Sequence, residues 1–158
     1  MTLKIEKALE RLKSILPLKE KQDDCSTEIK ELHQQLLRSF IERGRILTRN
    51  EMQQYVSNLD DAVNVLRQKD MVVFTEDGDP VGAYPFTMEE REHSIRVNGH
   101  QVYAMCALDA LSVGPMFGVE TQISSRCRVT GDSINVRQSG GTIENPGEVE
   151  DVHFGIMW

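Results

Sequence analysis

The side chains of Cys106 and Asp109 form the pair in this chain that is best suited to chemistry. They lie three residues apart in the run Tyr103–Leu111, and on a helix that spacing places both on one face. A thiolate is a soft metal ligand and a good nucleophile, and a carboxyl group can deliver a proton. The pair therefore indicates chemistry at a soft metal or at an electrophilic carbon. The alternative interpretation is that Cys106 is a small buried apolar residue of the helix.

The residues that precede this pair predict four helices. The first is expected to end at Pro17, the second near Gly44, and the third to open with the capping box Thr48–Glu51 and run through Val56. Residues 19–24 are expected to form a charged linker. The first, second and fourth helices are defined by apolar residues at helical spacing: Leu3, Ala8, Leu9, Leu12, Ile15 and Leu16; Ile29, Leu32, Leu36, Leu37, Phe40 and Ile41; Leu59, Ala62, Val63 and Leu66.

A β-hairpin is predicted to follow these helices. Met71–Phe74 and Val81–Tyr84 are strand candidates, and Glu76–Asp79 is the turn between them. Helices followed by a hairpin are typical of the winged helix-turn-helix, whose third helix reads bases. The third helix here has Arg49 as its only basic side chain, so a role as scaffold or protein-contact surface fits better than DNA binding.

The chain is expected to be α+β and to contain two regions. Residues 1–85 form a helical, winged-helix-like region, and residues 86–158 form a small mixed β domain with a short helix that carries the Cys-Ala-Leu-Asp motif. A linker over residues 85–92 is expected between the two. With 158 residues, the chain is long enough for one domain or for two small domains that share a core.

The motif helix is expected to follow a hairpin directly. Asn98-Gly99 is a strong type I′ turn signal between strands at residues 93–97 and 100–103. Cys106 would then lie near the N-terminus of a helix that ends at Gly114-Pro115, where the helix dipole lowers the pKa of a thiol. The remaining predictions are strands at residues 119–123, 133–137 and 152–156, a turn at 124–127 and a loop at 138–148.

Composition excludes several classes of function. A net charge of -7 argues against non-specific nucleic-acid binding, which needs a basic face. The chain has three cysteines and no CxxC spacing, which argues against a disulfide framework and against a four-cysteine zinc site. Cys25 follows two aspartates and is expected to be exposed and incidental to function. No apolar run is long enough to span a bilayer, no signal-peptide core is visible, and no nucleotide, flavin or phosphate loop is present. We therefore expect a cytoplasmic protein without an organic cofactor or a membrane partner.

Several motifs occur together in a distinctive order. A strand that ends in Val-Tyr-Ala precedes Cys106-Ala-Leu-Asp109, then come Ile-Ser-Ser-Arg-Cys127 and Thr130-Gly131, and finally Val152-His-Phe154. A Gly82-Ala-Tyr84 segment lies upstream. In these features the chain resembles the organomercurial (alkylmercury) lyases over most of its length.

The resemblance implies protonolysis of a carbon–mercury bond. Cys106 would bind mercury as a thiolate, and Asp109 would accept the thiol proton and pass it to the departing carbon. Cys127 matches a family cysteine that is usually interpreted as structural, and it is a further candidate metal ligand beside Cys106 and Asp109. The expected partners are a small organometallic substrate or a soft metal ion, together with a low-molecular-weight thiol.

The chain departs from the family pattern at one catalytic position. The family has a second catalytic cysteine just before the Val-His-Phe strand, and here that stretch is Pro146–Asp151, without a cysteine. Three explanations remain open. Cys127 or a free thiol from solution serves as the second sulfur; the native chain continues beyond Trp158 and supplies a cysteine there; or the protein has another task.

Three hypotheses follow. The first is an organomercurial-lyase-like enzyme that uses Cys106 and Asp109. The second is a non-catalytic binder of Hg or Cu(I), and the third is a winged-helix regulator with a metal sensor. His153 is either a further ligand or a half-buried ring with a hydrogen bond, and Glu148, Glu150 and Asp151 are either a hard-cation site or a solvated acidic loop.

Overall fold

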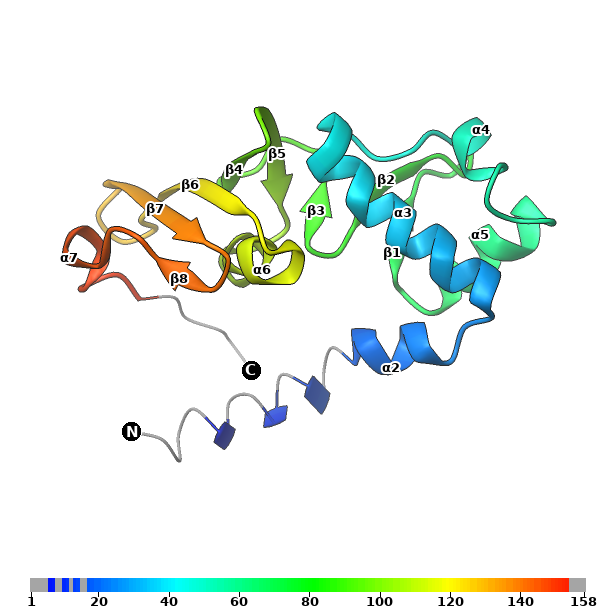
Figure 1. Ribbon diagram of the computed structural model, residues 1–158, viewed down its shortest axis with the longest axis horizontal. Coiled ribbons are helices and arrows are strands. Elements are labelled where there is room, and N and C mark those ends of the chain that lie inside the picture. Colours follow the sequence, from blue (N-terminus) through cyan, green and yellow to red (C-terminus); the bar gives the residue numbers. More distant parts are fainter. Residues whose placement is uncertain (1–5, 8–9, 12, 15–16, 154–158) are drawn as a thin grey trace.

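The computed structural model describes residues 6–7, 10–11, 13–14 and 17–153 (Figure 1). The predicted first helix depends on apolar residues that lie outside this part. The helices described are α2 (Leu18–Asp23), α3 (Thr27–Arg43), α4 (Arg49–Met52), α5 (Leu59–Gln68), α6 (Ala107–Phe117) and α7 (Pro146–Val149). The strands are β1 (Val72–Phe74), β2 (Pro80–Ala83), β3 (Phe86–Thr87), β4 (Ser94–Val97), β5 (His100–Ala104), β6 (Glu120–Arg126), β7 (Ser133–Ser139) and β8 (Thr142–Ile143). The α+β prediction is confirmed.

The described strands form one sheet in the order β1-β2-β3-β5-β4-β6-β7-β8. Every pairing is antiparallel. The sheet is therefore antiparallel throughout, whereas a mixed β domain was predicted. The reason is that β4 lies between β5 and β6, and these two strands, which run in the same direction around α6, are therefore never neighbours. The sheet is continuous across residue 85, where the sequence suggested a division into two regions.

The helices before the sheet follow the local signals in the sequence. Ser26 caps α3 by accepting the backbone N–H of Ile29, and Gly44 ends this helix in the left-handed conformation (φ 70°). The capping box between Thr48 and Glu51 is present at α4, although this helix ends at Met52 rather than at Val56. The predicted charged linker at 19–24 is largely helical, since α2 occupies Leu18–Asp23.

An aromatic contact joins the helices to the sheet. The Phe40 ring on α3 stacks on Phe86 of β3 with 4.8 Å between ring centroids, and Phe86 also contacts Phe117 at the end of α6, at 5.9 Å. Phe40 and Phe86 are completely buried. Phe86 lies inside the segment predicted to be a linker, and that prediction is wrong because β3 pairs with both β2 and β5.

The Asn98-Gly99 turn also fixes the end of α3. Both residues have positive φ, 48° and 79°, as a type I′ turn requires, so the predicted hairpin is confirmed. The Asn98 side chain donates to the carbonyl of Ile41 at 3.2 Å, and Nε2 of His100 donates to the carbonyl of Glu42 at 3.1 Å. The last carbonyls of a helix lack partners within the helix, and here the hairpin supplies them.

Helix α6 continues through Gly114-Pro115, contrary to the prediction, and ends at Phe117, with Gly118 as its C-cap. Pro115 has no N–H to donate to the carbonyl of Leu111, four residues earlier. The side chain of Gln138, on β7, donates to that carbonyl instead, at 3.2 Å. Thr121 of β6 donates to the other end of the same amide at 3.2 Å and fixes its orientation.

The last part of the chain is more regular than the sequence suggested. The predicted turn at 124–127 is strand as far as Arg126, because β6 pairs with β7 over its whole length. The predicted loop at 138–148 contains the end of β7, β8 and α7. Val152 and His153 are not in a strand, and the rest of the predicted final strand lies outside the described residues. Among the helices described, none has the length and apolar character needed to cross a membrane.

Candidate active site

Cys106 lies at the junction of β5 and α6. It is the N-cap of α6, with extended backbone dihedrals, and its Sγ accepts the backbone N–H of Asp109 at 3.4 Å. Asp109 is in the first turn of the helix, and its carboxylate also forms a hydrogen bond with the Cys106 thiol. The expectation that these two side chains face each other is therefore met, with Cys106 as the cap rather than as a residue within the helix.

The protonation of this pair differs from the sequence-based expectation. Burial raises the pKa of the Cys106 thiol, and the hydrogen bond to the Asp109 carboxylate raises it further. Backbone N–H groups of Leu108 and Asp109 act in the expected direction but are outweighed. Burial also raises the pKa of Asp109, against its hydrogen bonds with Cys106. In the resting state the thiol therefore holds the proton and the carboxylate accepts a hydrogen bond from it.

The two side chains of the pair differ in their exposure to solvent. Cys106 is exposed, whereas Asp109 is only partly accessible. Thiols that react with ligands need to be reachable, and a carboxyl group that exchanges protons near neutral pH needs a raised pKa. The arrangement meets both requirements at one end of one helix.

The turn at Tyr84-Pro85 lies against this site. The backbone N–H of Met105 donates to the carbonyl of Pro85 at 3.1 Å, and the Met105 side chain packs over Gly82, where an added Cβ would approach it to 2.9 Å. Tyr84 thereby comes near the pair: burial raises its phenol pKa, and the charges of Asp70, Asp109 and Cys106 add to the effect. Tyr84 was assigned only to a strand end, and its place beside Cys106 depends on contacts distant in sequence.

His93 is a second residue that the sequence did not assign to the site. It is buried, and its Nδ1 lies 2.8 Å from the hydroxyl of Ser125 on β6. Burial lowers its pKa, while the charges of Glu92 and Asp109 favour its protonated form. The register of the predicted hairpin places His93 opposite Ala104. Because Ala104 is two residues before Cys106, this register is the signal that could have identified His93.

Cys127 lies beyond the end of β6, apart from the pair. Its Sγ accepts the backbone N–H of Thr130 at 3.4 Å, and hydrogen bonds with Thr130 lower the pKa of this thiol. In the described part of the chain, no hydrogen bond or charge interaction links Cys127 to Cys106 or Asp109. All three cysteines of the chain are free thiols.

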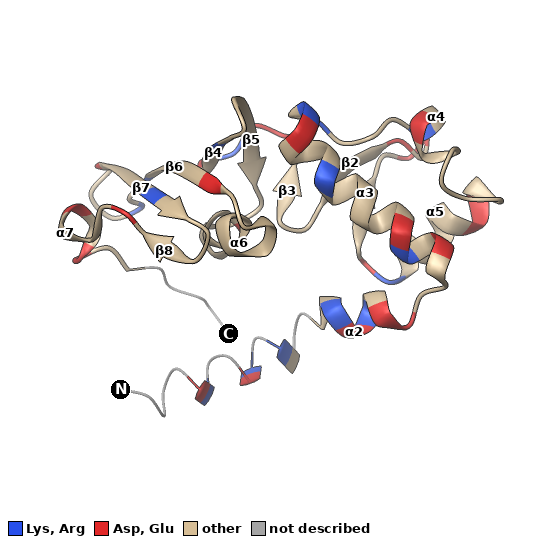
Figure 2. Ribbon diagram, viewed as in Figure 1, with Lys and Arg blue, Asp and Glu red and all other residues tan. Residues whose placement is uncertain are grey.

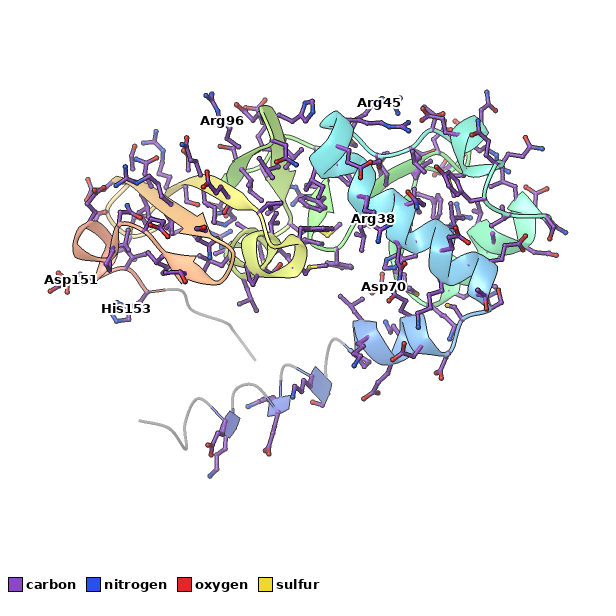
Figure 3. The ribbon with its side chains drawn as sticks, in the orientation of Figure 1. Arg38, Arg45, Asp70, Arg96, Asp151 and His153 are labelled. Carbon is purple, nitrogen blue, oxygen red and sulfur yellow. The ribbon has the colours of Figure 1, made fainter. Side chains whose placement is uncertain are left out.

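The remaining candidates lie at the other end of the region. His153 is exposed rather than half-buried, and its Nδ1 donates to the carbonyl of Asp151 at 2.9 Å. Figure 3 shows both side chains outside α7. Glu148 forms an ion pair with Arg137 at 3.3 Å, which is a surface role. Among the described residues, no three His, Cys, Asp or Glu side chains are grouped so that they could hold a metal ion.

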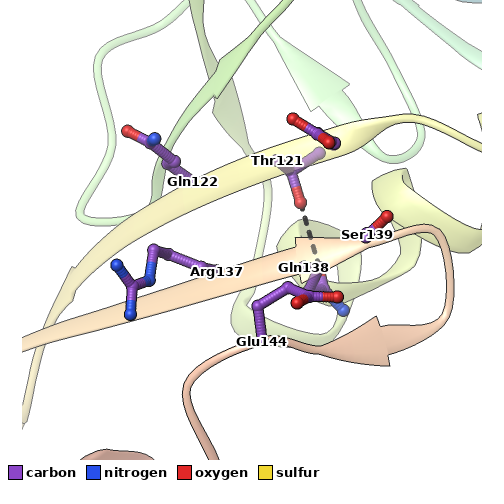
Figure 4. A pocket seen from close by; sticks show the side chains of 7 residues that line it. Thr121, Gln122, Arg137, Gln138, Ser139 and Glu144 are labelled. Atoms are coloured by element: carbon purple, nitrogen blue, oxygen red, sulfur yellow. Dashed lines mark hydrogen bonds between the residues drawn. The ribbon is translucent and has the colours of Figure 1, made fainter.

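A polar cavity of about 440 Å³ lies on β6 and β7, beside the residue that follows β8 (Figure 4). Its wall includes Arg137, Glu144 and the hydrogen-bonded pair Thr121 and Gln138. Cys106 and Asp109 do not line it. It is polar and its wall has no cysteine, histidine or methionine, so the reactive pair rather than this cavity defines the candidate site.

Comparison with known proteins identifies the same region. The alkylmercury lyase family model matches residues 86–157. An alkylmercury lyase of Staphylococcus epidermidis is 35% identical over 78 residues, which are 49% of this chain and 36% of the relative. One of Pseudomonas putida is 33% identical over 63 residues, or 40% of this chain and 29% of the relative. The matches thus span about a third of the length of these curated relatives.

A solved structure extends the likeness to most of the chain. The crystal structure of the mercury-bound form of MerB2 matches with a TM-score of 0.65 at 25% identity, and the match covers 80% of this chain and 65% of that one. The Cys106–Asp109 pair lies inside the segment that the family model matches. Residues 86–157 are thus similar to the alkylmercury lyases.

Proposed function

We propose that this chain cleaves carbon–mercury bonds by protonolysis, with Cys106 as the mercury-binding nucleophile and Asp109 as the proton shuttle. The observation that carries the proposal is the hydrogen-bonded pair of thiol and carboxylate at the start of α6, with the thiol exposed. It lies in the segment that matches the alkylmercury lyase family.

The first step transfers the thiol proton. Asp109 accepts the proton from Cys106, and the resulting thiolate forms a bond to the mercury of an organomercury–thiol compound. Sulfur is a soft donor and mercury a soft metal, so this bond is favourable. Because burial raises the pKa of Asp109, the carboxyl group can hold the proton until the carbon–mercury bond breaks and the carbon is protonated.

The second step breaks the carbon–mercury bond. The electron pair of that bond takes the proton from Asp109, the hydrocarbon leaves, and mercury(II) stays bound to Cys106 and to the original thiol. A second molecule of low-molecular-weight thiol then displaces Cys106, returns a proton to it and removes mercury as a dithiolate. In this sequence the proton on the product comes from Cys106, and no oxidant or reductant is needed.

The second sulfur on mercury comes from solution in this proposal. Cys127 is the alternative source, as a third metal ligand beside Cys106 and Asp109. Its thiol has a lowered pKa, which favours metal binding, but it interacts with Thr130 and not with the pair. Reduced thiols are required throughout, so we place the reaction in the cytoplasm.

The non-catalytic alternative is a mercury or copper carrier that uses the same fold. Simple capture of a metal by a thiolate does not require a carboxyl group bonded to the thiol. The close pairing of Asp109 with Cys106 therefore favours the lyase.

We further propose that the helices and the β1–β2 hairpin act as a winged-helix-like scaffold without binding DNA. Arg49, the basic residue of α4, pairs with Asp60 at 2.5 Å and donates to the carbonyl of Gly78 at 3.1 Å. Figure 2 shows acidic and basic residues interspersed along α2 and α3. Nucleic-acid binding needs basic residues gathered on one face.

A single-turnover assay tests the lyase. The protein is mixed in excess with phenylmercury, with and without a low-molecular-weight thiol, and the released benzene is quantified by gas chromatography. We expect benzene release that requires the added thiol, which supplies the second sulfur on mercury, and loss of release by at least about 100-fold in Cys106→Ser and in Asp109→Ala.

Two matched variants complete the assay. Cys25→Ser removes a thiol outside the site and is expected to leave release unchanged. Cys127→Ser should also cleave phenylmercury at the wild-type rate when thiol is present. Mercury binding without benzene release in the wild type would show a carrier rather than a lyase.

A further inference from the structure

Tyr84 places a phenol group near the reactive pair. Burial raises the pKa of this phenol, and the charges of Asp70, Asp109 and Cys106 raise it further. Since such charge effects fade with distance, the phenol lies near the start of α6 and near the turn that follows α5. Among the residues that the structure describes, none forms a hydrogen bond with the Tyr84 hydroxyl, and the protein does not enclose it. This hydroxyl is therefore a donor that a molecule bound at Cys106 can use.

The backbone fixes the place of Tyr84. Tyr84 and Pro85 form the turn between β2 and β3, because the residues on either side of them pair with each other and are completely buried. The carbonyl of Pro85 accepts the backbone N–H of Met105 at 3.1 Å, which holds the turn beside the residue that precedes Cys106. The hydroxyl of Tyr84 takes no part in these contacts, so it is free to bind another molecule.

The proposed reaction requires that a thiol from solution be held close to Cys106. Two sulfur atoms on one metal ion lie at most about 5 Å apart, which is twice a metal–sulfur bond of about 2.3 Å. A small thiol has no covalent link to the protein, so non-covalent contacts have to keep it in place. The backbone N–H groups of Leu108 and Asp109 already donate to the sulfur of Cys106. The Tyr84 hydroxyl is a donor that remains available.

We propose that the Tyr84 hydroxyl donates a hydrogen bond to the sulfur of the mercury-bound solution thiol and so holds that thiol opposite Cys106. This role rests on the proposed lyase function and adds a substrate-binding residue to it. A phenol is protonated at neutral pH, and the raised pKa of Tyr84 keeps it so, which makes the hydroxyl a donor. Asp109 remains the source of the proton for the carbon, and Tyr84 takes no part in proton transfer.

The first measurement is the retention of mercury, which does not depend on cleavage. The parent for all variants is the full chain with Cys25→Ser and Cys127→Ser, in which Cys106 is the only thiol. Cys25 is partly accessible, not exposed as the sequence suggested, and it is replaced because its thiol would also bind mercury. The protein is loaded with one equivalent of mercury(II) and dialysed against increasing concentrations of 2-mercaptoethanol. The mercury that remains bound is quantified by inductively coupled plasma mass spectrometry.

Tyr84→Phe is the decisive variant, since it removes the hydroxyl and keeps the ring. Tyr55→Phe is its matched control, because Tyr55 is also partly buried and, in the described part of the chain, no charge interaction links it to the pair. We expect Tyr84→Phe to lose half of its mercury at an about five-fold lower thiol concentration than the parent, which is the effect of one hydrogen bond. Tyr55→Phe should match the parent. Equal midpoints for the parent and Tyr84→Phe would overturn the proposal.

The benzene assay gives a second readout. The hydrogen bond is present both in the bound substrate and in the transition state, so Tyr84→Phe should raise the KM for the phenylmercury–thiol compound about five-fold and leave kcat unchanged. A lower kcat at an unchanged KM would overturn the proposal and assign Tyr84 to proton transfer instead. Failure of the lyase itself is distinguishable from these results. A parent that retains mercury but releases no benzene would refute cleavage, and the retention midpoints would still decide whether Tyr84 holds the thiol.

Discussion

The helical region, residues 27–87, and the sheet region, residues 94–149, are held together by different kinds of contact. Most of the large side chains that are completely buried belong to the helical region, namely Leu32, Leu36, Phe40, Leu47, Met52, Leu66, Met71 and Phe86. The sheet region has smaller buried apolar residues. Each region buries three polar side chains, and those of the sheet region, Thr121, Gln138 and Asn145, are all hydrogen-bonded. Apolar packing supports the first region, and hydrogen bonds between particular side chains support the second.

This difference explains why the family model matches less of the chain than the structural comparison does. The family model begins at residue 86, whereas the structural match to MerB2 covers 80% of the chain and therefore extends well before that residue. An apolar core accepts many residues of similar volume without a change of fold. A reactive pair or a hydrogen-bonded network requires particular residue types, so sequence similarity is detectable where these lie.

The largest effect is expected at Phe86, which contacts both regions. Phe86→Ala removes the ring between Phe40 and Phe117 and should lower the free energy of unfolding by about 3–5 kcal/mol. Because the sheet is continuous through β3, both regions should unfold in one transition at a lower denaturant concentration. Urea denaturation followed by far-UV circular dichroism measures this.

Phe74→Ala is the control for Phe86→Ala. Phe74 is only partly buried, at the edge strand β1, and its loss should cost less and leave the sheet region intact. Two separate transitions in Phe86→Ala would show that the helical and sheet regions are not one cooperative unit.

The next largest effect concerns His33, a buried histidine of the helical region. Its pKa is about 4 in the folded protein and about 6.5 when unfolded, so between these values the unfolded chain binds a proton that the folded chain does not. Stability is complete above pH 6.5 and falls as the pH decreases toward 4, by about 3 kcal/mol in total. Urea midpoints from pH 7 to pH 4, with a chelator present, should show this loss in the wild type and less of it in His33→Gln. Parallel pH curves for the two proteins would contradict the assignment.

A satisfied polar group in the sheet region should behave differently. Gln138→Leu leaves the carbonyl of Leu111 without a partner beside Pro115 and is expected to lower stability by about 2 kcal/mol at every pH between 5 and 8. Thr121→Val removes only the contact that orients the Gln138 amide, and about 1 kcal/mol is expected. Thermal denaturation compares them, and an equal loss in both variants would show that the Leu111 carbonyl does not need the amide.

The elements that local signals define were predictable from the sequence. The apolar stripe, Ser26 and Gly44 together define α3, and Asn98-Gly99 defines the hairpin of β4 and β5. Helix α6 was predicted too short, because the partner that lets it pass Pro115 is Gln138, a residue 23 positions later in the chain. The two-residue strand β3 was missed for the same reason, since it exists only through its neighbours β2 and β5.

The candidate site was predictable in its reactive atoms but not in its surroundings. Cys106 and Asp109 are close in sequence, so their spacing was sufficient to pair them. The approach of Tyr84 and His93 depends on strand register and on the Met105–Pro85 hydrogen bond, which the sequence does not encode locally. The direction of the Cys106 pKa shift was predicted wrongly, because the sequence indicated the helix dipole but not the burial and the carboxylate that oppose it.

The smallest effect is expected at Asp109, where function and stability should oppose each other. A carboxylate in the first turn of a helix gains about 0.3–1 kcal/mol from the helix dipole, yet the pKa of Asp109 is raised, so burial outweighs that gain. The charged form therefore destabilises the folded protein above the folded pKa of this group, and its penalty disappears as the pH falls below the unfolded value. Asp109→Asn should accordingly abolish benzene release and slightly raise the melting temperature at pH 7, and the difference from the wild type should vanish near pH 3–4. A lower melting temperature for Asp109→Asn at pH 7 would mean that the hydrogen bonds with Cys106 stabilise the carboxylate more than burial destabilises it. The sheet region would then hold its reactive pair at no cost in stability.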